Sequence, residues 1–176
     1  MKKTSTVFKI LSMVVVVIVC CSCVSSFYLH PEGGFRPKEP NFSLAKNKLL
    51  FNTNIDTMAV YIHNDTLKVG ENDKYQIISL LKFYNNGCFM RNSIDIKDKI
   101  DRDYLIPSHI GYYQINKNNI KSELFDINLK NGKSKYIQRQ GIIKGDSIIL
   151  DSQFIEGGKD IYIKQKVDFV AKPANW

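Results

Sequence analysis

From about residue 55 onward, apolar and polar residues alternate with a period of two. This alternation is typical of β-strands that bury one face. Ile, Tyr, Phe and Val are plentiful in these stretches, and the breaks between them are rich in Asn, Gly and Asp. Eight strands are predicted, near residues 55–63, 75–85, 88–92, 110–117, 120–129, 134–143, 147–155 and 160–170. The pattern therefore predicts an all-β protein.

Short turn motifs separate most of the consecutive strands. They are Asn86-Gly87, Asn118-Asn119, Asn131-Gly132, Gly145-Asp146 and Gly157-Gly158. Such short connections are typical of β-hairpins, so strands adjacent in sequence should pair in the sheet. We predict an eight-stranded antiparallel meander that forms a barrel or a strongly curved sheet.

The last predicted strand has an apolar parity and a mostly polar one. The apolar parity comprises Ile161, Ile163, Val167 and Phe169, and the other comprises Tyr162, Lys164, Lys166 and Asp168. We expect the side with the isoleucines to be buried and the side with the lysines to be wet.

Two strands depart from simple alternation. In residues 120–129 the apolar parity changes between Leu124 and Phe125, which predicts a β-bulge that bends the strand. Residues 75–85 are apolar on both parities, so both faces of that strand should be covered.

The segment 92–102 lacks the β pattern. Ile96 and Ile100 are spaced i, i+4 among charged residues, which predicts a short helix that caps one end of the barrel. Its aspartates alternate with basic residues, and no glycine supplies the turn of a calcium-binding loop, so we predict no metal site.

The N-terminus has the pattern of an export signal. Lys2 and Lys3 precede an apolar run from Ile10 to Val19, which would span about 15 Å as a helix and is too short to cross a bilayer. We expect residues 1–22 to be a signal peptide. After the signal peptide we expect a tether at 23–46 and a β-barrel domain at 47–176. The aromatic residues of the tether should pack part of it on the barrel.

Three cysteines, Cys20, Cys21 and Cys23, surround the expected cleavage point. Ser22-Cys23 resembles the lipobox of bacterial lipoproteins, in which a small residue precedes an acylated cysteine. The resemblance implies a diacylglyceride and a further acyl chain, such as palmitate, on Cys23, and hence a stable membrane anchor. Because the first acidic residue after it is Glu32, the resemblance favours the periplasmic face of the outer membrane. The alternative is a cleaved signal without acylation.

Three further stretches carry a resemblance: FYNNG at 83–87, GYYQINKNNIKSELFDI at 111–127 and GIIKGDSIIL at 141–150. Together they resemble small lipocalin-like or calycin-like lipoprotein domains of Gram-negative anaerobes. The resemblance implies a lipocalin-like barrel, and it implies little about function because it consists of turns and core positions.

The charge argues against nucleic-acid binding. The formal net charge is +8, but without the three lysines of the export segment the chain carries 22 basic and 17 acidic residues. Only four basic residues are arginines, and no basic stripe with interleaved aromatic residues is present.

Catalytic motifs are also absent from the sequence. His30, His63 and His109 are not spaced as metal ligands, and Ser108-His109 lacks a nucleophile elbow. An enzyme would need His63 or His109 beside a carboxylate in a cleft. Cys88 is expected to be a small buried residue. We predict no enzymatic activity, no cofactor and no metal.

The aromatic residues are the candidates for binding. The candidate ligand or partner face comprises Tyr84, Tyr112, Tyr113, Phe125 and Tyr136. We expect a non-enzymatic envelope lipoprotein that binds a protein or polymer, of the inhibitor or immunity type. The alternative is a lipocalin-like carrier of a small apolar ligand.

Overall fold

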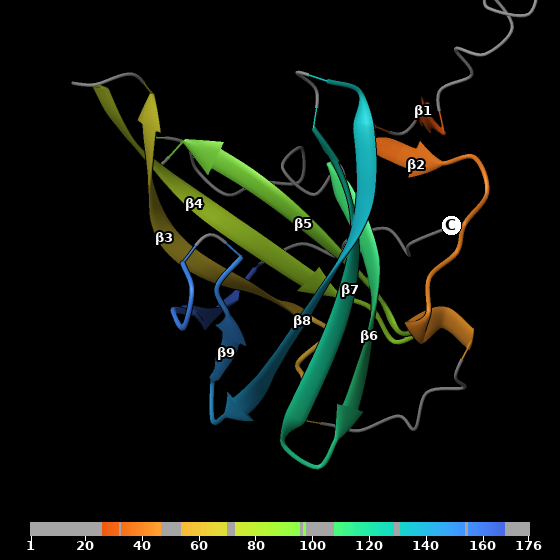
Figure 1. The fold of residues 1–176 in the computed structure, drawn as a ribbon. Helices are drawn as coiled ribbons and strands as arrows, with labels where there is room; N and C mark the ends of the chain where they lie inside the picture. Colours follow the sequence, from red (N-terminus) through yellow and green to blue (C-terminus); the bar gives the residue numbers. More distant parts are fainter. Residues whose placement is uncertain are drawn as a thin grey trace, which may run out of the picture.

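The computed structural model describes residues 26–31, 33–46, 54–69, 73–95, 97, 108–128, 131–153 and 155–167. Eight strands form the body: β3 (Ala59–Val69), β4 (Asp73–Phe83), β5 (Cys88–Asp95), β6 (His109–Asn116), β7 (Asn119–Asn128), β8 (Lys133–Lys144), β9 (Ser147–Asp151) and β10 (Lys159–Lys166). Before them come the short strands β1 (Phe27–Leu29) and β2 (Phe35–Pro37) and the 3-10 helix η1 (Leu44–Lys46). Figure 1 shows this arrangement.

The eight strands form a closed antiparallel barrel. Each pairs with its neighbour in sequence from β3 to β10, and β10 closes the barrel on β3. This confirms the all-β prediction and the antiparallel meander, and it shows a closed barrel. The tight turns lie where glycine permits a positive φ, for example Gly87 at 82° and Gly145 at 58°.

The predicted bulge in β7 is wrong. Pairing with β8 runs in regular register through Leu124 and Phe125, and pairing with β6 is regular up to Leu124. Leu124 packs in the main core cluster, and Phe125 packs with Phe42 in a second cluster. The parity change in the sequence arises because both faces of β7 are covered.

The predicted sidedness of the last strand is also wrong. The Tyr162 side chain is 1 % exposed within the barrel core, whereas Ile161 and Ile163 are each 48 % exposed. Tyr162 can point inward because its hydroxyl meets the polar atoms of Arg139 and Ser79. The isoleucines therefore lie on the outside.

From Ile78 to Phe83, β4 is buried on both faces, as predicted. Leu81 belongs to the main core cluster, and Leu80 packs with Val60 and Met90 in a separate cluster. Val167, which follows β10, packs against the cluster of Leu80, Val60 and Met90 and covers part of it.

The described part of the predicted tether, residues 26–31 and 33–46, packs on the barrel, and we call it the N-terminal strap. β1 and β2 pair as a hairpin, and β2 and η1 contact the barrel at β6 and β7 (Figure 1). Phe42 is buried there. The aromatic residues of the strap provide the apolar area that holds it on the barrel.

Part of the predicted capping helix is strand, because Asn92 to Asp95 belong to β5. The rest of 92–102, apart from Lys97, lies outside the described residues. The predicted signal peptide at 1–22 and Cys23 also lie outside them.

Candidate functional site

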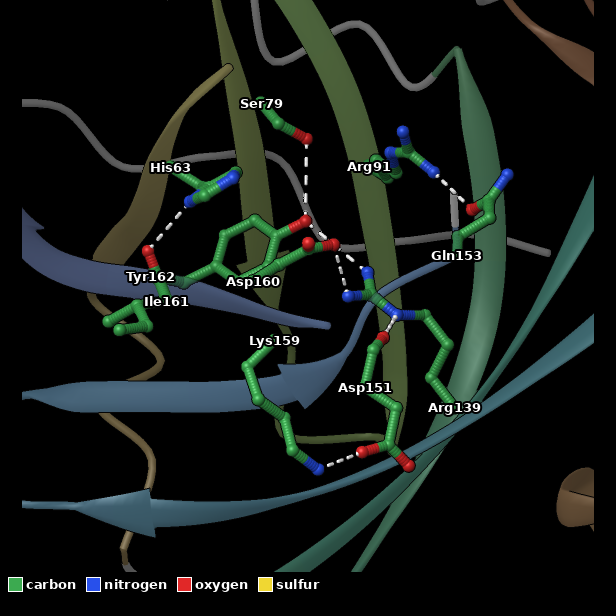
Figure 2. Close-up of polar contacts among 10 residues, drawn as sticks. All are labelled: His63, Ser79, Arg91, Arg139, Asp151, Gln153, Lys159, Asp160, Ile161 and Tyr162. Atoms are coloured by element: carbon green, nitrogen blue, oxygen red, sulfur yellow. Dashed lines mark hydrogen bonds and ion pairs between the residues drawn. The ribbon is translucent and has the colours of Figure 1, made fainter. Parts of the chain in front are cut away.

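A polar cluster occupies one part of the barrel interior (Figure 2). Arg139 of β8 donates from Nε to the backbone oxygen of Asp151 at 2.6 Å. Its Nη2 forms an ion pair with Asp160, and its Nη1 lies 3.3 Å from the Tyr162 hydroxyl. A buried guanidinium with these partners has its charge compensated by the protein itself.

His63 and Ser79 extend this cluster around Tyr162. The Ser79 hydroxyl lies 3.5 Å from the Tyr162 hydroxyl, and the His63 and Tyr162 rings lie 5.3 Å apart. His63 Nδ1 lies 3.0 Å from the backbone oxygen of Ile161 on β10. His63 therefore links β3 to β10 through its side chain.

His109 lies beside a carboxylate, as a catalytic histidine would. Its Nε2 is 3.2 Å from Asp126 Oδ1, and its Nδ1 is 3.0 Å from the Ser108 hydroxyl. Burial, together with Arg91 and Arg36, lowers the pKa of His109, and Asp126 opposes the shift.

The Ser108 hydroxyl is nevertheless poorly placed as a nucleophile. It has one hydrogen, and the backbone oxygen of Arg91 accepts it at 2.8 Å. Arg91 also donates to Gln153 Oε1 at 2.7 Å, which connects β5 to the β9–β10 loop. These contacts hold strands together at one end of the barrel.

The five aromatic candidates fall in three places. Tyr112, Phe125 and Tyr136 come together on the outside of β6–β8, where their rings surround Phe42 of the strap. Tyr113 belongs to the main core cluster, and its hydroxyl donates to the backbone oxygen of Tyr84 at 2.9 Å.

Burial also raises the pKa of Tyr113 to about 12. Tyr84 packs against the cluster outside β3–β5, and burial raises its pKa to about 12 as well. The candidate face is thus not one continuous surface, and the chain's own strap covers its largest part.

Glu123 holds the strap in place, a role that sequence reasoning missed. Its carboxylate accepts the backbone N–H of Leu44 at 2.9 Å and the Ser43 hydroxyl at 3.1 Å. Gln138 donates to both Glu123 and Ser43. Glu123 shares its parity with Phe125 and Ile127, so an acidic residue next to two outward apolar positions was the signal that could have revealed it.

An exposed isoleucine face lies on the outside of β8–β10, and we define it as Ile142, Ile161 and Ile163. Ile142 is 44 % exposed. Ile142 and Ile161 both pair in register with Ile149 of β9, so these residues form a row across three strands. Ile163 pairs with Ile62 of β3 and continues the apolar surface across the barrel closure.

Comparisons of the chain with protein-family models, curated proteins and solved structures found no match. Within the described residues, His, Cys, Asp and Glu form no group of three able to hold a metal ion. No helix in the same part of the chain is long and apolar enough to cross a membrane.

Proposed function

We propose that this chain is a non-enzymatic envelope lipoprotein whose barrel binds another protein through the isoleucine face. The observation that carries this proposal is the exposure of three aligned aliphatic side chains on β8 and β10. Exposed apolar surface of this kind marks interaction sites in soluble domains. The outer faces of β4 and β7, in contrast, are covered.

The filled interior favours a protein partner over a small apolar ligand. Six residues of the main core cluster leave no more than 1 % of their surface accessible to water: Leu81, Phe83, Ile120, Ile148, Leu150 and Tyr162. A ligand-sized cavity beside these side chains would expose them to its contents. An apolar ligand would have to displace packed side chains, at a cost in packing energy.

The proposed location is the periplasmic face of the outer membrane, with acyl chains on Cys23 as the anchor. Labelling cells with a palmitate analogue tests the anchor. The Cys23→Ala variant should lose the label, and label that persists on this variant would refute the attachment site.

Affinity purification of the full-length chain from envelope extract tests the binding function. The amount of specific partner recovered with the Ile161→Thr/Ile163→Thr variant should fall about tenfold or more. Recovery with the Leu29→Thr/Met58→Thr variant should be unchanged. The control pair is also exposed, at 65 % and 60 %, but lies elsewhere on the chain. Equal recovery with both variants would contradict the proposal. A small molecule released on denaturation in native mass spectrometry would favour the carrier alternative.

A further inference from the structure

The barrel closes by a short seam between β3 and β10. Among the described residues, the two strands pair at four positions, from Ile62 with Ile163 to Ala59 with Lys166. In the same register the next pair would join His63 to Tyr162, but this pair is not formed. The His63 side chain instead bonds to the backbone oxygen of Ile161 at 3.0 Å (Figure 2).

Beyond this seam, β3 continues with a single described neighbour. From His63 to Val69 it pairs with β4, and among the described residues no strand pairs with its other side. In Figure 1 the β3–β4 hairpin extends past β10 at the upper left. A strand edge of this kind presents backbone donors and acceptors that can template another strand.

The direction of the backbone groups on this edge follows from the pairing. Lys164 N donates to the backbone oxygen of Asp146, so the even-numbered residues of β10 face β9 and the odd-numbered ones face β3. Ile163, an odd-numbered residue, pairs with Ile62. Even-numbered residues of β3 therefore direct their N–H and C=O groups away from β4, and this alternation continues at Asn64, Thr66 and Lys68.

We propose that the β3 edge from Asn64 to Val69 accepts an extended segment of the partner protein as an additional β-strand. This inference rests on the proposed function and specifies the form of the partner. Backbone hydrogen bonds would supply affinity, and alternate side chains would supply specificity.

The isoleucine face indicates which side chains the partner strand carries. Ile161 and Ile163 lie on β10 directly across the seam from β3, and both are exposed. A strand added to the β3 edge would lie beside Ile161. Apolar side chains on the outward face of that added strand would remove the exposed surface of Ile161 from water. The partner segment is therefore an extended strand with apolar residues at alternate positions.

Site-specific cross-linking in the full-length, envelope-anchored chain tests the inference. A photoreactive benzoylphenylalanine replaces Asn64, which is exposed, and a control chain carries it at Asn85, which is exposed in the turn between β4 and β5. We expect a cross-link from position 64 to an apolar, extended segment of a partner. Thr66→Pro, which removes one outward N–H, should reduce its yield about tenfold or more, and Thr66→Ala should leave it unchanged.

A second proline and alanine pair at Lys68 guards against a folding artefact, and each variant is checked for an unchanged thermal unfolding midpoint. If the Thr66→Pro and Thr66→Ala variants cross-link equally while Ile161→Thr/Ile163→Thr abolishes capture of the partner protein, the inference about the β3 edge fails and the proposed function stands. If the isoleucine variant also has no effect, the proposed function fails. A cross-link to a second copy of this chain would replace the partner strand with self-association.

Discussion

Two outer faces of the same barrel differ in what covers them. On β6–β8, outward aromatic side chains lie beneath the N-terminal strap, with Phe42 at the centre. On β8–β10, the outward isoleucines remain exposed. An apolar outer face of a barrel thus identifies an interaction surface only where the chain's own segments leave it open.

Phe42→Ala is expected to have the largest effect on this comparison. Phe42 is buried between the rings of Tyr112 and Tyr136, so its removal leaves a cavity and should lower the free energy of unfolding by about 3 kcal/mol. Urea unfolding measures the change. Leu29→Ala in the same strap, at an exposed position, is the control, with an expected loss within about 0.5 kcal/mol. Equal effects of the two variants would mean that the strap does not cover this face.

Glu123→Ala should have the next largest effect, about 2 kcal/mol, because it leaves the Leu44 N–H and the Ser43 hydroxyl without their acceptor. Glu123→Gln keeps one oxygen acceptor and should cost less. The measurement is the same urea titration, combined with proteolysis of the strap. A strap that is no more easily cleaved in the alanine variant would show that Glu123 does not anchor it.

Local alternation and turn chemistry were sufficient to predict the eight-stranded antiparallel meander, but not whether it closes into a barrel. Turn pairs such as Asn86-Gly87 and Gly145-Asp146 located the hairpins, and the register follows from hairpin connections. Alternation alone could not assign the inner face of β10. Tyr162 and Ile161 are both compatible with a core, and the choice depends on Arg139, which lies on another strand.

The candidate surface was harder to predict than the fold. The sequence identifies Tyr112, Phe125 and Tyr136 as aromatic, but their covering by Phe42 depends on contacts with residues about 70 to 95 positions away in the chain. The isoleucine face was missed because Ile161 and Ile163 were assigned to the buried side of the last strand. Both outcomes depend on long-range packing, which local patterns do not encode.

Acidification should destabilise the fold through His109, the first residue of β6. Burial, Arg91 and Arg36 lower its pKa below the ordinary 6.5, so near that pH the unfolded chain binds more protons than the native one. Stability should therefore fall as the pH decreases through 6.5 and below. His109→Gln should flatten this part of the stability profile, measured by urea unfolding at successive pH values. His63→Gln is the matched control, and a slope unchanged by His109→Gln would exclude this origin.

Ile161→Thr should have the smallest effect, because the Ile161 side chain is 48 % exposed and the change removes little buried apolar area. We expect the free energy of unfolding to change by less than about 0.5 kcal/mol. Its neighbour provides the sharpest contrast. Tyr162→Phe removes only the hydroxyl that meets Arg139 and Ser79 inside the barrel, and should cost about 1 kcal/mol. If Ile161→Thr proved the more costly of the two, the isoleucines would be the buried side of β10. Loss of partner binding without loss of stability in Ile161→Thr would instead assign this residue to the interaction surface.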